Sequence, residues 1–494
     1  MKRRCFALTA AVVLCPYLWG MNSGRTHEAG AVVANPAAID IGSRLELFVD
    51  DLLIDRLTGA SLKLHEPQPA GVVLRFDAPW EGAFCGYVTV LHDKNRFRMY
   101  YRGLPVDGAD GSTNEVTCYS ESADGLTWNK PKLGLFEIGG SRDNNVVLAG
   151  RPPFSHNFAP FLDTRPGVPS EERFKALAGT STSGLHVFAS GDGLRWRPWR
   201  EGPILSEGAF DSQNVAFWSE AEHCYAAYFR TWTGGGFAGY RTVSRATSPD
   251  LVQWSAPVEM SFGDTPREHL YTSQTQPYFR APHIYLATPM RFVPGRKVLT
   301  SEQARALGVD PGYTSDAADA VLMATRGGKR YTRLFMEALI RPGNDLGNWA
   351  SRAGLTALGI VPTGPAEISL YKQAHYAQAS AHLVRYALRT DGFISVNAPY
   401  GGGELSTKPL VFQGHQLAIN FATSAAGSLR VELQNAEGKP LPGFGLEDAV
   451  EQIGDDIERI VTWKTGPDVS RLSGKPVRLR FAMKDADLFS LQFR

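Results

Sequence analysis

The sequence predicts an all-β fold, in which a five-bladed β-propeller over residues 40–390 precedes a β-sandwich over residues 391–494. The first indication is a turn motif, Ser-x-Asp-Gly-x-x-Trp, which stands at residues 122–128 and 190–196 and in a looser form at residues 247–254. The second is that short runs rich in Val, Phe, Tyr and Trp, bounded by Gly, Pro and Asp, surround these copies, as is typical of strands. A unit of four short strands that recurs about every 60 residues indicates a propeller.

Each copy of the motif combines a tight turn with an aromatic anchor. Asp-Gly supplies the positive-φ positions of a hairpin turn, and the Trp that follows can pack between neighbouring sheets. A degenerate fourth copy stands at residues 325–331. Because a ring of blades needs closure, we expect an N-terminal strand to join the last blade, and residues 47–49 and 52–54 are the candidates for it.

The strands of the blades are expected in chain order. They are predicted at residues 86–91, 97–102 and 116–120 for blade one, 156–162 and 173–178 for blade two, 185–190, 214–218 and 224–230 for blade three, 271–278 and 284–287 for blade four, and 320–324, 367–371 and 381–386 for blade five. Between the last two blades, Thr300 and Gln303 form a capping box before a short helix.

The pattern changes close to Asp391. Apolar and polar residues alternate from there to the end of the chain, at residues 410–412, 416–421, 428–433, 477–481 and 488–493. Alternation indicates strands with one buried and one solvated face, and about 100 residues of such strands suit a β-sandwich. No low-complexity linker marks the boundary, so we expect the two domains to pack firmly.

The N-terminus has the pattern of a secretory signal peptide over residues 1–30. A positive segment from Lys2 to Arg4 precedes a mostly apolar stretch, and small residues follow near Ala29; an uncleaved anchor is the alternative. No later stretch is apolar enough to span a membrane. We therefore expect a secreted or periplasmic protein with no membrane contact after cleavage.

Charge and cysteine content exclude other classes. The formal net charge is +1, and acidic and basic residues are mixed along the chain, so no basic face for nucleic acid is expected. Three cysteines, Cys85, Cys118 and Cys224, remain after the signal peptide. This odd number leaves at least one thiol free unless it pairs between chains, and no disulfide framework, metal site or cofactor motif is expected. The oligomeric state stays open.

Carboxylates at the entrance to the inner strands are candidates for catalysis, because inner strands of a propeller converge on its axis. Glu81 stands there in blade one, Asp211 in blade three, Glu268 in blade four and Glu367 in blade five. One carboxylic acid would protonate a leaving glycosidic oxygen, and a second would activate water or attack carbon. The expected substrate-binding residues are Asp51, Trp80, His156, Asn157, Gln213, Asn214 and His269.

Structural roles are the alternatives for these residues. Glu81 could form a salt bridge at a blade edge, Asp211 could cap a turn, and Glu268 could pair with a neighbouring arginine on the surface. His156 could be a satisfied core histidine. Asp51 follows another aspartate, so at most one of the two points inward from a strand.

The repeated turns, the run Phe97-Arg-Met-Tyr-Tyr101 and the order of propeller and sandwich resemble secreted bacterial proteins related to glycoside hydrolase families 32 and 43. The resemblance implies the fold and a broad class of hydrolase. The Asn-Asp-Pro-Asn-Gly, Arg-Asp-Pro and Glu-Cys motifs of family 32 are absent, so it leaves the substrate and catalytic residues open. The turn is also similar to the Asp-box of sialidases, although we recognise no arginine triad in the sequence.

Two functions are compatible with these features. The first is an exported glycoside hydrolase that cleaves a poly- or oligosaccharide with two carboxylates. The second is a carbohydrate-binding propeller without catalysis. The two differ in one feature of the pocket, because catalysis needs a pair of facing carboxylates and binding needs only aromatic and polar groups.

Overall fold

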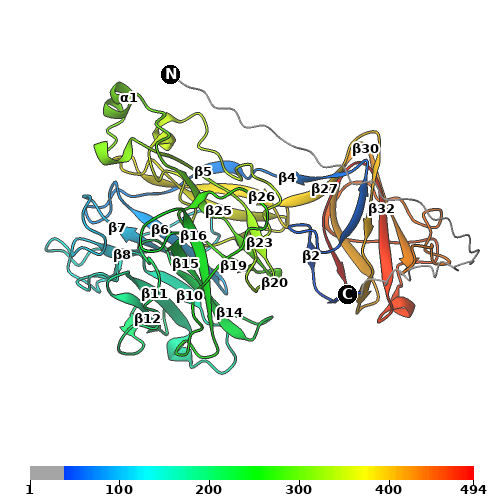
Figure 1. Cartoon of the computed structure of the whole chain (residues 1–494), viewed down its shortest axis with the longest axis horizontal. Helices are drawn as coiled ribbons and strands as arrows, with labels where there is room; N and C mark the ends of the chain where they lie inside the picture. Colours follow the sequence, from blue (N-terminus) through cyan, green and yellow to red (C-terminus); the bar gives the residue numbers. More distant parts are fainter. Residues whose placement is uncertain (1–37) are drawn as a thin grey trace, which may run out of the picture. The chain divides into compact units, whose positions relative to one another are not determined.

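The computed structural model of the protein describes residues 38–494, and the expected signal peptide lies outside them. The described chain is an all-β protein (Figure 1), with one short helix, α1 (Ser301–Ala306), inside this range. The capping box predicted for that helix is present, because Thr300 accepts from the Gln303 N–H and the Gln303 side chain accepts from the Thr300 N–H. Four short 3₁₀ helices stand at Ser170–Glu172, Pro311–Tyr313, Leu346–Trp349 and Ser470–Leu472.

The first three blades are antiparallel four-stranded sheets, each built from consecutive strands. Blade one contains β6 (Gly86–Asp93), β7 (Arg96–Gly103), β8 (Val116–Ser122) and β9 (Val146–Leu148). Blade two contains β10 (Ala159–Leu162), β11 (Phe174–Thr180), β12 (Gly184–Ser190) and β13 (Arg197–Pro198). Blade three contains β14 (Val215–Ser219), β15 (Cys224–Trp232), β16 (Arg241–Ser248) and β17 (Val258–Glu259).

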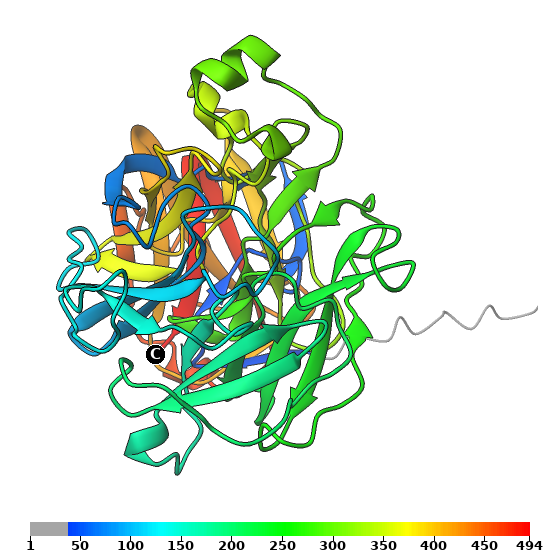
Figure 2. The same ribbon diagram turned by 90° about the vertical axis from the view of Figure 1, so that its left-hand side faces the viewer.

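The fourth blade is divided into two three-stranded sheets. One joins β19 (Gln276–Tyr278), β20 (Ala281–Ala287) and β23 (Met323–Thr325); the other joins β18 (His269–Leu270), β21 (Met290–Val293) and β22 (Ala317–Ala320). Pro289 separates β20 from β21, and proline cannot donate to a strand ladder. We therefore count the two sheets as one interrupted blade, and Figure 2 shows the sheets following one another around a common centre.

The last blade contains β24 (Val361–Gly364), β25 (Glu367–Ala374), β26 (His382–Arg389) and, from the N-terminal side, β5 (Gln68–Arg75). An N-terminal strand thus completes the last blade, as expected, but it is not the segment that we expected. β5 includes Pro69 and Gly71, and its pairing with β26 is irregular, so its sequence has no clear strand pattern. Proline and glycine are tolerated there because β5 is an edge strand.

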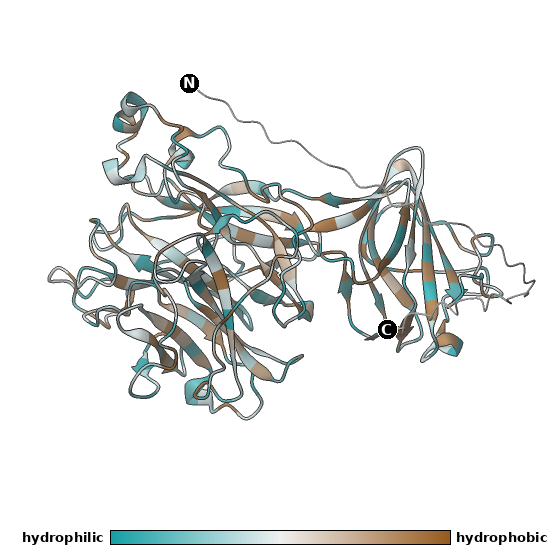
Figure 3. Cartoon of the chain, in the orientation of Figure 1, coloured by the Kyte–Doolittle hydropathy of each residue, from teal (hydrophilic) through white to brown (hydrophobic). Residues whose placement is uncertain are grey.

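Ten strands form the remaining sheet, and four of them precede the propeller. They are β1 (Ile39–Gly42), β2 (Glu46–Leu47), β3 (Ile54–Thr58), β4 (Ser61–Leu64), β27 (Ile394–Ala398), β28 (Gly403–Thr407), β29 (Leu410–Phe412), β30 (Leu417–Asn435), β31 (Asp455–Ile460) and β32 (Val477–Phe493). The sequence predicts that residues 47–49 and 52–54 close the propeller, and this is wrong, because β2 pairs with β32 and β3 with β28. The apolar residues of this sheet share one core, and apolar and polar residues alternate along β32 (Figure 3).

The three clear turn motifs occupy equivalent positions, between the third and fourth strands of their blades. In each blade the turn serine pairs with an aromatic residue near the start of the second strand: Ser122 with Phe97, Ser190 with Phe174, and Ser248 with Tyr225. Each turn aspartate accepts the main-chain N–H groups two and three residues later. The motif therefore marks the same hairpin three times, as the sequence predicts.

Candidate active site

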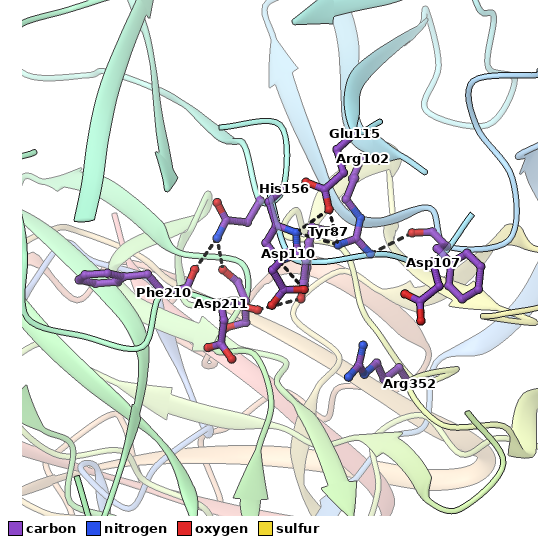
Figure 4. A network of polar contacts seen from close by, with 12 residues as sticks. Tyr87, Arg102, Asp107, Asp110, Glu115, His156, Phe210, Asp211 and Arg352 are labelled. Atoms are coloured by element: carbon purple, nitrogen blue, oxygen red, sulfur yellow. Dashed lines mark hydrogen bonds and ion pairs between the residues drawn. The ribbon is translucent and has the colours of Figure 1, made fainter. Parts of the chain in front are cut away.

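One end of the propeller gathers a polar residue from every blade. Each residue stands on an inner strand or in the segment that leads into one: Tyr87 on β6, and His156, Asp211, Tyr271 and Arg352 in the segments before β10, β14, β19 and β24. Figure 4 shows Tyr87, His156, Asp211 and Arg352 together. The inner strands of a propeller converge on its axis, which is why residues so far apart in the sequence meet here.

The backbone is strained at the same end. Tyr87, Phe210, Gln274 and Arg352 have positive φ values of 52°, 49°, 51° and 63°. A side chain in this left-handed region costs about 1–2 kcal/mol, and such residues concentrate at ligand and catalytic sites. At Tyr87 the cause is a register shift in β6 between Gly86 and Thr89, and an irregularity of this kind re-aims a side chain.

Blade one contributes a buried ion-paired group. Arg102, from β7, has its Nη1 3.9 Å from Glu115 Oε1 and 3.2 Å from His156 Nδ1. Glu115 Oε1 lies 2.8 Å from His156 Nδ1, and because a carboxylate accepts, Nδ1 is the donor in this contact. His156 Nε2 has no hydrogen bond and lies 3.6 Å from Asp110 Oδ1.

Blade three contributes Asp211, whose side chain is 20% exposed. Arg230, from β15, donates to it through both Nε, at 3.0 Å, and Nη2. The Tyr87 hydroxyl donates to the Asp211 main-chain oxygen at 3.2 Å. Asp211 is therefore held in place by two blades while its carboxylate remains open to solvent.

Blade four places Tyr271 among three arginines. The guanidinium carbons of Arg230, Arg352 and Arg241 lie 4.4, 5.3 and 5.7 Å from the centre of its ring. Burial alone would raise the pKa of the Tyr271 hydroxyl, but the charges of Arg352 and Arg230 outweigh it, so this pKa is below its ordinary value of 10.0. The cations thus stabilise negative charge at this point of the site.

The other expected catalytic carboxylates have partners elsewhere. Glu81 is fully buried and accepts from the Tyr101 hydroxyl at 2.6 Å and from Lys130. Glu268 pairs with two arginines beside β18, and Glu367, the first residue of β25, pairs with Arg385 on β26. None of these partners contacts Asp211. The inner strand of blade five is β24 and that of blade four is β19, so Glu367 and Glu268 do not stand at inner strands.

The expected binding residues are also divided between two roles. Asn157, Asn214 and Gln213 are buried and bind main-chain or side-chain groups that hold the inner-strand entrances together. The Trp80 indole donates to Asn145 inside blade one, and Asp51 lies on the surface, where its main-chain oxygen accepts from Lys408. His269 lies beside the site, where its Nδ1 accepts from the Arg241 main-chain N–H at 3.2 Å. Of the expected set, Asp211, His156 and His269 belong to the site.

The arginines are the part of the site that the sequence did not reveal. In blades one and three, an aromatic residue of the second strand pairs with the turn serine, and an arginine follows it five residues later: Arg102 and Arg230. Aligning the blades on the turn motif would therefore have placed these two arginines at equivalent positions. Tyr271 and Arg352 have no such signal, because neither belongs to a repeated motif. Their positions depend on where the inner strands of blades four and five begin.

The opposite ends of the inner strands line a different space. A mostly apolar cavity of about 340 Å³ is bounded there by residues such as Val90, Ala216 and Leu358. Near the arginines, a cleft of about 430 Å³ is lined by Trp232, Phe237 and the intervening glycines. Within residues 38–494, no group of His, Cys, Asp and Glu could hold a metal ion, and no helix is long and apolar enough to cross a membrane.

No protein-family model and no curated protein matches this chain. Solved structures do, at low identity. A glycoside hydrolase is 12% identical, with a TM-score of 0.45, and covers 66% of this chain and 92% of its own. A family 43 arabinoxylan arabinofuranohydrolase from Bacillus subtilis is 12% identical, with a TM-score of 0.39, over 84% of this chain and 97% of its own. An N-acetylgalactosamine deacetylase from F. plautii is 13% identical, with a TM-score of 0.40, over 68% and 97%. The likeness concerns the fold alone.

Proposed function

We propose that the protein is a glycoside hydrolase whose site lies where the five inner strands begin. The observation that carries the proposal is that each of the five blades brings a polar residue to the end of the propeller where Asp211 lies, with strained backbone at four of the entrances. The adjacent cleft supports a carbohydrate ligand. Trp232 and the 60% exposed Phe237 line it, and aromatic faces of this kind pack against sugar rings.

The proposed chemistry uses Asp211 and Asp110 as the two carboxylates. Both lie beside Tyr87 (Figure 4), and Asp110 is the more exposed, with 57% of its side chain accessible. Asp110 gives a proton to the glycosidic oxygen, and the bond from that oxygen to the anomeric carbon breaks. A water molecule adds its hydroxyl group to this carbon, and its remaining proton goes to Asp211. We give Asp211 the role of base because the role needs a charged carboxylate, and Arg230 pairs with that charge.

The test is hydrolysis of a panel of aryl glycosides and polysaccharides by three variants. Asp211→Asn and Asp110→Asn keep the side-chain shape and remove the charge, so each should lower the rate at least about 100-fold. Asp143→Asn is the matched control, because Asp143 is 68% exposed and pairs with Lys132 on the surface. Wild-type rates for Asp211→Asn would rule out this assignment. Binding of a polysaccharide without hydrolysis would favour the carbohydrate-binding propeller instead.

We also propose export, on the grounds of the signal pattern over residues 1–30. The mature protein is then secreted or periplasmic. Mass analysis of the protein recovered from producing cells should show a chain that begins near residue 31. Recovery of the full-length chain in the membrane fraction would indicate the uncleaved anchor.

A further inference from the structure

The arginines of the site are not balanced by its carboxylates. Arg102 lies near Glu115, and Arg230 is paired with Asp211. Arg241 and Arg352 have no carboxylate within ion-pair distance among residues 38–494; within this range the guanidinium of Arg352 donates one hydrogen bond, to the Tyr313 hydroxyl at 3.4 Å, and lies over the rings of Tyr271 and Tyr313. Two positive charges therefore remain without a partner at the surface of the site.

Arg241 packs against aromatic rings. Its guanidinium carbon lies 4.4 Å from the ring centre of Trp232 and 4.8 Å from that of Phe292, so aromatic rings hold it in place. Its Nε is buried and has no hydrogen-bond partner. A partly buried charge with an unpaired donor is unfavourable, and its energy falls when an anion supplies the missing acceptor.

The neighbouring acids do not fill this role. Asp107 accepts from the Tyr313 hydroxyl at 3.0 Å, and Asp110 faces His156. Arg230, whose guanidinium carbon lies 4.4 Å from the centre of the Tyr271 ring, adds a further positive charge beside this tyrosine. Burial and the charges of Arg230 and Arg352 lower the pKa of Arg241, which is the effect of several cations held close together.

We propose that Arg241 and Arg352 form a subsite for an oxyanion on the sugar, either a carboxylate or a sulfate ester. Both groups are planar or tetrahedral arrays of oxygen acceptors, and a guanidinium matches them with two parallel hydrogen bonds. Such a subsite defines the class of sugar that the proposed active site takes, so this proposal rests on the proposed function. It requires only binding, so it can be tested without turnover.

The test compares binding of glucuronic acid, glucose 6-sulfate and glucose by calorimetry at low ionic strength. Either acidic sugar should bind at least about tenfold more tightly than glucose. Arg241→Gln and Arg352→Gln should each weaken binding of the acids by about 10- to 100-fold, and should weaken binding of glucose by less than this. Arg267→Gln is the matched control, because Arg267 is 58% exposed and pairs with Glu259. The acid that binds better distinguishes a carboxylate site from a sulfate site.

A second measurement tests the subsite if a glutamine variant does not fold. Inorganic sulfate should raise the melting temperature of the wild type more than that of Arg241→Lys with Arg352→Lys, which keep the charge but lose the paired donors. Equal binding of glucose and both acids, or unchanged acid binding in both glutamine variants, would overturn the subsite. Hydrolysis of neutral sugars with no preference for acids would overturn the subsite and leave the glycosidase proposal standing. Binding of the acidic sugars without hydrolysis of any substrate would support the subsite and overturn the glycosidase proposal.

Discussion

Tyr271 is the residue at which the charges of the site act most strongly. It is 4% exposed, and its burial opposes ionisation, yet the nearby Arg352 and Arg230 reverse the direction of the shift. Tyr87 lies in the same group but has a raised pKa, because burial dominates there. Arg102 and Arg230 also lower the pKa of Tyr87, but burial, together with the charges of Tyr271 and Asp110, outweighs them, so the pKa values of these two neighbouring phenols shift in opposite directions.

We expect one tyrosine of the folded protein to ionise below its ordinary pKa of 10.0, and Tyr271→Phe to remove that transition. Because the folded pKa is lowered, ionisation of Tyr271 favours the folded state: the gain is complete above 10.0 and is lost as pH falls through the folded pKa. The measurement is a pH titration of phenolate absorbance in the folded wild type and in Tyr271→Phe. Identical titration curves below pH 10 would contradict the charge arrangement around this residue.

Individual residues show where sequence reasoning fails. The sequence pattern brings Asp211 to the candidate site because this residue stands shortly before a strand with a clear pattern, β14, and its role in catalysis stays a prediction. Glu367 was misplaced because its strand is as apolar as an inner strand, and the short β24 with its Pro and Gly was not recognised. Glu81 stands five residues before β6, but the intervening turn directs it toward Lys130. The direction in which a loop side chain points depends on tertiary contacts, so the periodicity of the sequence does not predict it.

At the level of elements, the turn motifs were predictable because their chemistry is local. Ser190, Asp192 and Gly193 make the turn with their own side chains and backbone, so no distant residue is needed to recognise it. The edge strand β5 is the opposite case. It pairs with β26, more than 300 residues later in the chain, and its own sequence contains proline and glycine. Residues 68–75 form a strand only because the fold brings them beside β26.

The turn glycine can be tested with an internal control. Gly193 and Gly202 both have a φ of 74°, but a Cβ at Gly193 would lie 2.7 Å from the Tyr100 hydroxyl, whereas one at Gly202 meets nothing within 4 Å. Gly202→Ala should cost about 1 kcal/mol, the backbone strain alone, and Gly193→Ala about 1–3 kcal/mol more. Denaturant unfolding measures both. Equal losses would show that the turn does not pack against blade one.

At the scale of the molecule, the chain enters and leaves the propeller through one sheet. β1 to β4 and β27 to β32 belong to that sheet, so its strands come from both sides of the propeller in the sequence. The alternation after residue 391 predicted the C-terminal strands. It could not predict the N-terminal ones, because β2 and β3 are too short for a period to be recognised.

Asp391 joins the two parts at the point where the chain leaves blade five. It is fully buried, and its carboxylate accepts from the hydroxyls of Tyr278 at 2.7 Å and Ser490 at 2.8 Å and from the Asn420 amide at 3.2 Å. Arg280 supplies the compensating charge at 3.2 Å. Tyr278 belongs to β19, Asn420 to β30 and Ser490 to β32, so one carboxylate ties blade four to the sandwich.

We expect Asp391→Asn to destabilise the protein by about 2–4 kcal/mol, since it removes the buried one of the two carboxylates that pair with Arg280 and points an amide N–H₂ group at two donors. Asparagine tolerates the positive φ of 61° at this position, so the loss reports the network and not the backbone. The measurement is denaturant unfolding, with Asp143→Asn as the exposed control. If the two parts depend on this contact, the variant should also unfold in two separate transitions where the wild type shows one. An unchanged single transition with wild-type stability would show that the apolar contacts around Phe393 and Ile394 hold the parts together without the carboxylate.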